Sequence, residues 1–167
     1  MLEVGFGMGE ATAEAAALDP ARDVLAVDVH TPGVGALLDR VHALGLANIR
    51  VATGDAVELL RDRIAAESLD EVRAWFPDPW PKARHVKRRL VAAPFAALVT
   101  SRLRVGGRLH VATDWAPYAD QVLAVVDAAP GLALVSRERG DRPVTRFERQ
   151  ALAAGRAVVD VVAERVG

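Results

Sequence analysis

Apolar runs of strand length alternate along the whole chain with longer segments whose apolar residues recur at helical spacing. The predicted strands are residues 1–4, 24–29, 49–53, 72–76, 108–113, 133–136 and 157–162. The predicted helices are residues 9–18, 34–44, 56–66, 85–103 and 117–128. Strict alternation of strand and helix is typical of a parallel sheet with helices on both faces. We therefore expect an α/β fold whose ligands bind beyond the carboxyl ends of the strands.

The first predicted strand is short, with barely three residues before a glycine turn, whereas a central strand usually has about five or six. At 167 residues, the chain has the size of one domain with a full core. We predict a single domain over residues 1–167. The short first strand suggests a truncated form of a longer protein.

The composition is ordinary for a soluble globular protein, with 51% hydrophobic residues, 26% charged residues and a net charge of -1. The absence of Cys excludes disulfides and thiolate metal sites, and the four His residues show no metal-ligand spacing. No apolar run approaches the length of about 20 residues that a membrane span needs, and the first ten residues do not resemble a signal peptide. The near-neutral charge argues against a protein coated in nucleic acid but allows one local basic patch.

The segment EVGFGMGE places Gly5, Gly7 and Gly9 at alternate positions after the first strand. Glycine lets the backbone turn sharply and approach a ligand closely. A dinucleotide-binding turn has Gly where this chain has Glu10, and a pyrophosphate there would meet a carboxylate. Glu3 favours a cationic ligand such as S-adenosylmethionine, which has no phosphate and carries an amino group and a sulfonium. A tight turn without a ligand is the alternative.

Two further acids follow the next two strands. Asp28 ends the second strand, where a carboxylate can accept hydrogen bonds from both ribose hydroxyls. Asp55 follows the third strand, where it could accept a hydrogen bond from an adenine amino group. Each alone is compatible with a turn residue or a helix cap. Together with Glu3 they form one constellation on one edge of the sheet, which favours an adenosine ligand, and S-adenosylmethionine over NAD.

The segment FPDPWPKARHVKRRL, residues 76–90, begins at the end of the fourth strand. Its three prolines stiffen the loop and hold Asp78 at the carboxyl edge. Trp80 is either a base-stacking surface or a plug against the next helix. A run of cations without acids follows, and since cations at a helix N-terminus oppose the helix dipole, a phosphate-binding patch explains the run better than a solvated helix face. The run contains Lys82, Arg84, Lys87, Arg88 and Arg89, with His85 among them.

Two polar residues belong to the segment RLHVATDWAPYA. His110 lies inside an apolar strand, and we predict a packed core residue rather than a catalyst. Asp114 follows the same strand and is either the N-cap of the next helix or a substrate ligand. Its position at the ligand edge favours the substrate role.

Six segments, in this order along the chain, resemble motifs of the bacterial tRNA (guanine-N7-)-methyltransferase family. They are LEVGFGMGE, VDVHTPGVG, GDAVELL, FPDPWPKARHVKRRL, GGRLHVATDWAPYA and RPVTRFERQALAAGRAVVDV. The resemblance implies the Rossmann-like class I methyltransferase fold, a seven-stranded, mostly parallel sheet with its last strand antiparallel and helices on both faces. It also implies methyl transfer from S-adenosylmethionine to N7 of guanosine 46 in the variable loop of tRNA, in the cytoplasm.

The resemblance also implies roles for individual residues. Asp78 is the expected catalytic residue. The expected cofactor-binding residues are Glu3, Gly5, Gly7, Asp28, Asp55 and Asp78. The expected substrate-binding residues are Lys82, Asp114, Thr145, Arg146, Phe147 and Glu148. The expected RNA-contacting segment is Arg84, His85, Val86, Lys87, Arg88 and Arg89.

The sequence departs from the family pattern at three places. Asp28 stands where Glu is usual, Arg146 where Lys is usual, and Gln150-Ala151 replaces an Arg-Gly pair. Family members also have residues before the first strand. Two other functions stay open: a small-molecule methyltransferase, which the basic run opposes, and a non-catalytic RNA-binding module, which the complete set of acids opposes. A monomer and a homodimer are both compatible with the sequence.

Overall fold

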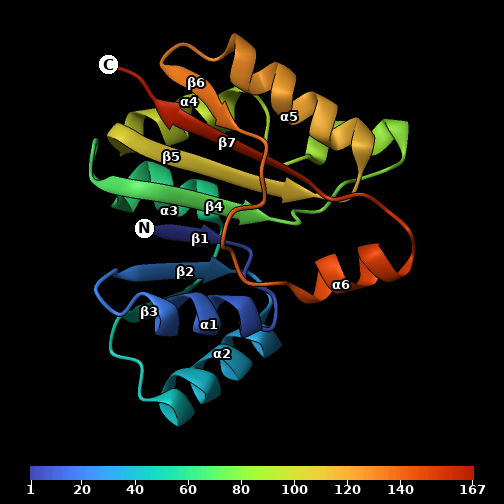
Figure 1. The fold of residues 1–167 in the computed structure, drawn as a ribbon. Coiled ribbons are helices and arrows are strands. Elements are labelled where there is room, and N and C mark those ends of the chain that lie inside the picture. Colours follow the sequence, from blue (N-terminus) through green and yellow to red (C-terminus); the bar gives the residue numbers. More distant parts are fainter.

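A computed structural model describes residues 1–167 and contains one seven-stranded sheet of order β3-β2-β1-β4-β5-β7-β6 (Figure 1). Neighbouring strands are parallel, except that β7 runs antiparallel to both β5 and β6. The strands are β1 (Leu2–Val4), β2 (Val24–Asp28), β3 (Ile49–Thr53), β4 (Leu69–Trp75), β5 (Leu103–Thr113), β6 (Leu132–Ser136) and β7 (Val159–Arg165). The predicted Rossmann-like sheet with an antiparallel last strand is therefore confirmed.

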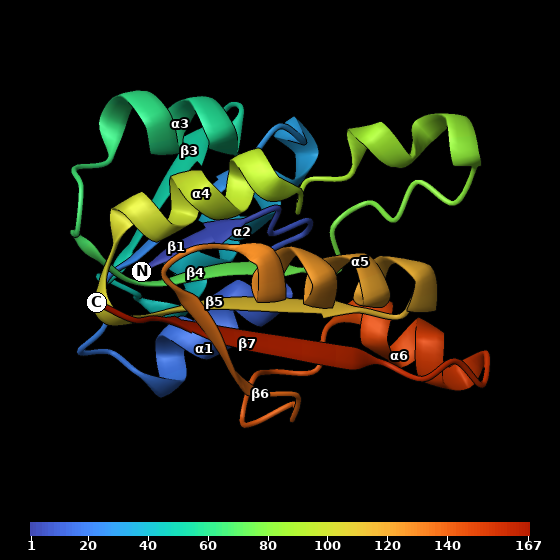
Figure 2. The ribbon, with the colours of Figure 1, turned by 90° about the horizontal axis from the view of Figure 1, so that it is seen from above.

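Helices lie on both faces of this sheet, as the alternating pattern predicts (Figures 1 and 2). Helices α1 (Glu10–Leu18) and α2 (Thr31–Leu44) pack on one face, and α3 (Ala56–Arg63), α4 (Ala93–Arg102) and α5 (Ala116–Ala128) pack on the other. Helix α6 (Arg146–Ala153) lies beyond the carboxyl ends of the strands, at the right in Figure 1. None of the helices is long and apolar enough to cross a bilayer.

Each face of the sheet has its own apolar core. The larger core contains Leu60, Val99 and Tyr118, which are fully buried between α3, α4 and α5 and the strands. The smaller core contains Ala13 and Leu37 from α1 and α2. Burial of this kind contributes about 25 cal/mol per Å² of apolar surface, so the strands form a stiff platform for the loops at their ends.

The α1 face is covered only in part. Between α1 and the loop after β6 lies a groove of about 840 Å³, whose floor is formed by β4 and β5. The floor is polar: Glu71 on β4 accepts hydrogen bonds from Arg22 and from Arg73, each at 2.7 Å. Ion pairs therefore replace an apolar layer on this part of the sheet.

The predicted helix 85–103 is wrong. The chain forms a short 3-10 helix, η1 (Ala83–Arg88), then an extended link, and then α4. Pro94 lies in the first turn of α4, and Ala92 before it is extended, with φ −135° and ψ 170°. A proline has no N–H for a helical hydrogen bond and clashes with the preceding turn, so one continuous helix cannot pass through this position.

Other elements also differ from the prediction. Strand β5 begins at Leu103, before the predicted residue 108, and β7 covers residues 159–165 rather than 157–162. Helix α6 was not predicted; it has only eight residues, fewer than an average helix, and half of them are polar. Its start signal is a capping interaction, in which Thr145 Oγ1 accepts a hydrogen bond from the Glu148 backbone N–H at 3.1 Å.

Candidate active site

The glycine turn after β1 adopts a left-handed backbone at three positions, with φ 76° at Gly5, 57° at Gly7 and 73° at Gly9. Only glycine adopts this conformation at little cost. A Cβ at Gly5 or Gly7 would meet no atom within 4 Å, so the space beside these two residues is open. The backbone N–H of Gly7 donates to Asp28 Oδ2 at 2.8 Å, which ties the turn to the end of β2.

A fourth glycine, Gly33 in the first turn of α2, completes this region and was not predicted from the sequence. A Cβ at Gly33 would lie 1.9 Å from the Gly7 carbonyl oxygen, and a Cβ at Gly9 would lie 2.7 Å from Leu37 Cβ. Both distances are too short for any real Cβ. The start of α2 therefore packs directly on the glycine turn and fixes its shape.

Glu3 lies under the turn and is buried, with 4% of its surface exposed. Its Oε1 accepts a hydrogen bond from Thr12 Oγ1 at 2.8 Å, and its Oε2 has no hydrogen-bond partner. Burial raises the pKa of the Glu3 carboxyl above its ordinary value, although the Thr12 hydrogen bond and the charge of Arg73 act in the opposite direction. A buried carboxylate oxygen without a partner is costly and is well suited to a cationic group.

Asp28 and Asp55 both have structural roles at their strand ends. Asp28 Oδ1 accepts from the His30 N–H at 2.9 Å, while Oδ2 accepts from Gly7. Asp55 caps α3, since its Oδ1 accepts from the N–H groups of Val57 and Glu58. Its second oxygen stays free to face solvent. The helix-cap alternative is therefore realised at Asp55, on the same edge as the predicted nucleoside contact.

The proline-containing loop after β4 has a strained backbone. Phe76 and Trp80 have positive φ values of 56° and 44°, which are unusual for large side chains. Asp78, between them, is exposed at the carboxyl edge. Trp80 is half-buried: its ring meets His85 edge-on at 5.6 Å and lies 5.1 Å from the guanidinium carbon of Arg88. Trp80 thus packs against the segment of cations at residues 82–89, the basic segment, and is not a core residue.

Four cations of the basic segment face solvent and take part in no ion pair. These are Lys82, Arg84, Lys87 and Arg88. His85 and Val86 are half-buried within η1. Because no acid compensates these charges, the segment is an exposed positive patch beside Asp78.

Arg89 corrects the predicted RNA-contacting set. It is only 7% exposed, and its guanidinium donates to the Pro79 and Pro117 carbonyl oxygens and to Gln121 Oε1. It also lies 5.0 Å from the ring of Tyr118. Arg89 therefore anchors the loop after β4 to α5 and is largely buried, unlike the exposed cations beside it.

Asp114 lies at the end of β5 and does not cap α5. The N-cap of α5 is Trp115, without a side-chain cap, and the Trp115 N–H donates to Thr113 Oγ1. Asp114 Oδ2 instead accepts from Arg156 Nε at 2.8 Å. The helix-cap alternative for Asp114 is thereby excluded, and its carboxylate stays at the ligand edge.

The predicted substrate-binding residues of α6 divide into two pairs. Thr145 and Glu148 are buried, Thr145 as the helix cap and Glu148 in contacts with arginines. Arg146 and Phe147 are exposed. The Phe147 ring stacks on Phe76 with centroids 6.2 Å apart and planes inclined by 23°. This stack joins α6 to the strained loop that carries Asp78.

Residues 1–161 match the model of a family described as "Putative methyltransferase". The chain is 52% identical to the tRNA (guanine-N(7)-)-methyltransferase of Streptomyces avermitilis, over 99% of this chain and 59% of that protein. Its identity to the proteins of the same name is 49% for Pseudomonas fluorescens, over 99% of this chain and 71% of that protein, and 52% for Nitrosospira multiformis, over 96% and 72%. The chain belongs to the tRNA (guanine-N7-)-methyltransferase family. It spans 59% to 72% of the length of these three family members.

Solved structures support the fold of this family member. An rRNA methylase from Streptococcus thermophilus is 20% identical with a TM-score of 0.65, over 99% of this chain and 87% of that chain. A methyltransferase from Aquifex aeolicus is 16% identical with a TM-score of 0.66, over 99% and 81%. The [4+2]-cyclase SpnF also matches, with 20% identity and a TM-score of 0.68 over 99% and 74%. A cyclase on the same fold illustrates that the fold alone does not fix the reaction.

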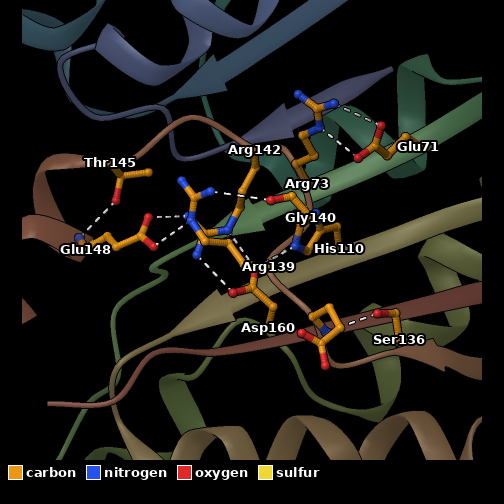
Figure 3. Close-up of polar contacts among 11 residues, drawn as sticks. Glu71, Arg73, His110, Ser136, Arg139, Gly140, Arg142, Thr145, Glu148 and Asp160 are labelled. Carbon is orange, nitrogen blue, oxygen red and sulfur yellow. Dashed lines mark hydrogen bonds and ion pairs between the residues drawn. The ribbon is translucent and has the colours of Figure 1, made fainter. Parts of the chain in front are cut away.

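A buried ionic network supports α6 in this member of the tRNA (guanine-N7-)-methyltransferase family (Figure 3). Arg142 donates to Asp160 on β7 and to Glu148 on α6, and Arg139 donates to the second oxygen of Glu148 at 2.8 Å. His110 Nε2 lies 2.7 Å from Asp160 Oδ1. His110 is 8% exposed, which confirms the predicted core position. The network fastens the loop before α6 to β5 and β7 of the sheet.

Burial opposes ionisation of Asp160, but the hydrogen bonds from Arg142 and His110 outweigh it and hold its pKa below the ordinary value. Burial alone would lower the pKa of Arg142, but its hydrogen bonds to Asp160 and Glu148 raise the pKa above its ordinary value. The sequence contained a signal for this site, since Asp160 interrupts the apolar run VVDVV, and a carboxylate in such a strand is rarely buried unpaired. Its partner was not predicted. No cluster of three or more His, Asp or Glu side chains forms a metal site.

Proposed function

We propose that this protein transfers a methyl group from S-adenosylmethionine to N7 of a guanosine in tRNA, at position 46 of the variable loop. The observation that carries the proposal is the exposed Asp78 in a strained loop, directly beside four unpaired cations. Family membership supports the same reaction, but the relatives are longer, so the activity of this chain is itself part of the proposal. A tRNA substrate implies a cytoplasmic location.

The residues beneath the glycine turn fit S-adenosylmethionine. Glu3 has a buried oxygen without a partner, which matches the ammonium group of the methionine moiety. The open space beside Gly5 and Gly7 allows the ligand to approach the backbone. Asp28 and Asp55 supply carboxylate oxygens for the ribose and the adenine amino group. When bound, the cofactor supplies an electrophilic methyl group on a sulfonium.

Guanine N7 has a free lone pair, so no base is needed to create the nucleophile. The residues have to hold the base in line with the methyl group, and orientation of this kind contributes much of the rate enhancement of such reactions. The purine becomes positively charged as the methyl group arrives. The fixed carboxylate of Asp78 stabilises that charge, and Asp114 accepts hydrogen bonds from the Watson–Crick edge and holds the base.

The basic segment positions the RNA. Lys82, Arg84, Lys87 and Arg88 are free to bind phosphates, because no acid of the protein pairs with them. Trp80 and the exposed Phe147 supply aromatic surface on which an unstacked base can lie. A small-molecule methyltransferase has no need for this exposed charge, which favours tRNA as the substrate.

The test is methyl transfer from labelled S-adenosylmethionine to unmodified tRNA, followed by digestion to nucleosides. We expect labelled N7-methylguanosine as the product. Asp78→Ala should lower kcat by about two orders of magnitude or more, the range for loss of one transition-state contact. Asp127→Ala, at an exposed position of α5, is the matched control and should turn over normally. Transfer only to small metabolites, or full activity of Asp78→Ala, would contradict the proposal.

A further inference from the structure

Arg156 lies just after α6, at the edge of the sheet where Asp114 ends β5. Its backbone N–H donates to the Ala151 carbonyl oxygen at 2.9 Å, and Gly155 before it ends the helix with φ 69°. The backbone of Arg156 is therefore fixed. Its side chain, in contrast, is 46% exposed, and its single polar contact within the protein is the ion pair with Asp114.

The ion pair uses a carboxylate that the proposed reaction needs. The Watson–Crick edge of guanine has two neighbouring N–H donors, which match the two oxygens of one carboxylate. A base bound to Asp114 therefore competes with Arg156 for Oδ2. Ion pairs of this exposure contribute little net stability, so the pair can be exchanged at little cost.

Arg156 and the basic segment flank the loop of Asp78 from opposite sides. In both views η1 lies on one side of this loop, and the connection from α6 to β7 lies on the other (Figures 1 and 2). Arg146, the first residue of α6, is exposed and takes part in no ion pair. If an RNA strand crosses the loop of Asp78 with its target base pointing into the site, the phosphates before and after that base lie on opposite sides of the loop.

We propose that Arg156 is a further RNA contact of the site, which exchanges Asp114 for a backbone phosphate when the target guanine enters. This inference rests on the proposed function. Before RNA binds, Asp114 neutralises Arg156 and keeps it at the edge. After the base takes Asp114, the guanidinium binds a phosphate on the side opposite η1. The RNA is then held on both flanks, which fixes its orientation over Asp78.

The test compares Arg156→Ala with Arg108→Ala in tRNA binding across a salt series. Arg108 is a matched control, since it is 56% exposed, forms one ion pair, with Glu164, and lies in the middle of β5, away from the edge that carries Asp114. For Arg156→Ala, we expect the slope of log K against log salt to become shallower by about 0.7 to 0.9, with affinity at low salt reduced about three- to tenfold. Arg156→Lys should keep the slope, and Arg108→Ala should match the unmodified protein.

Binding of S-adenosylmethionine and the melting temperature serve as checks on each variant, and both should stay unchanged. Equal slopes for Arg156→Ala and the unmodified protein would overturn the phosphate contact, even if methyl transfer falls, because Arg156 would then act only through Asp114. If the unmodified protein neither binds nor methylates tRNA, the proposed function fails instead. The two failures are thus distinguished by the unmodified protein alone.

Discussion

Arg142 and Asp160 are joined by two hydrogen bonds, from Nε to Oδ1 at 2.6 Å and from Nη2 to Oδ2 at 2.9 Å, with both side chains almost fully buried. The guanidinium carbon of Arg142 also lies 5.6 Å from the ring centroid of Phe76, the first residue of the strained loop that carries Asp78. The buried pair of Arg142 with Asp160 on β7 therefore supports both α6 and the candidate catalytic loop.

The pKa of Asp160 is held below its ordinary value, so this pair links stability to pH. The stabilisation is fully present above the unfolded carboxyl pKa, near 4, and is lost as pH falls through the lower folded value. Asp160→Asn should lower the free energy of unfolding at neutral pH by about 3–5 kcal/mol, since it removes one of the two carboxylates that pair with the buried Arg142. Denaturant titrations between pH 7 and pH 3 measure both effects, and an equal loss on acidification in the variant would contradict this assignment.

Glu3 has the opposite linkage, because burial raises its pKa. The ionised carboxyl reduces stability as pH rises through the folded pKa, so Glu3→Gln should raise the melting temperature at neutral pH. The same change should weaken S-adenosylmethionine binding by about 1–3 kcal/mol, the range for a lost charged hydrogen bond. Calorimetry should show that affinity of the unmodified protein falls with acidification and that the variant lacks this dependence. Tight, pH-dependent binding in Glu3→Gln would rule out the proposed ammonium contact.

Gly33 and Gly35 provide a matched pair in one helix. A Cβ at Gly33 would lie 1.9 Å from the Gly7 carbonyl oxygen, whereas a Cβ at Gly35 would meet nothing within 4 Å. Gly33→Ala should destabilise the fold by about 1–3 kcal/mol through overpacking and weaken cofactor binding roughly tenfold, since the turn must move. Gly35→Ala should stabilise the protein by about 1 kcal/mol through helix propensity. Thermal melts and calorimetry measure these effects, and similar behaviour of the two variants would contradict the packing described for α2.

The burial of Arg89 separates it from its exposed neighbours. Replacing Arg84, Lys87 and Arg88 together by Ala should make the salt slope of tRNA binding shallower by about 2 to 3 units, with little change in stability. Arg89→Ala should leave the slope nearly unchanged and reduce the free energy of unfolding by about 1–3 kcal/mol, since it leaves buried acceptors unpaired. A salt series and denaturant titrations distinguish the two outcomes. An unchanged slope in the triple variant would show that these three cations do not bind RNA phosphates and form only a solvated surface.

The strand and helix pattern was predictable because each element buries one face against the sheet and therefore shows a period. The prediction of one helix over residues 85–103 failed at Pro94. Apolar residues on both sides suggested a single helix, but a helical backbone cannot continue through this proline. The strand-end acids were predictable from their positions alone. The Arg142–Asp160 and Arg156–Asp114 pairs join residues that are far apart in sequence. No local sequence pattern shows that the fold brings them into contact. The run of cations in the sequence likewise did not indicate that the side chain of Arg89 is buried while its neighbours are exposed.

The position of β7 also sets the order in which the molecule can be completed during its synthesis. Of the seven strands β7 is the last to leave the ribosome, yet it lies inside the sheet, paired with β5 from Arg108 to Thr113 and with β6 on its other side. A nascent chain that ends before residue 159 therefore has the glycine turn and every candidate acid of the active site, but neither Asp160 nor a partner for the edge of β5. Until translation passes this strand, Arg142 has no Asp160 to bind and α6 lacks its tie to the sheet. The sheet that carries the candidate site is thus complete only after β7 has been synthesised.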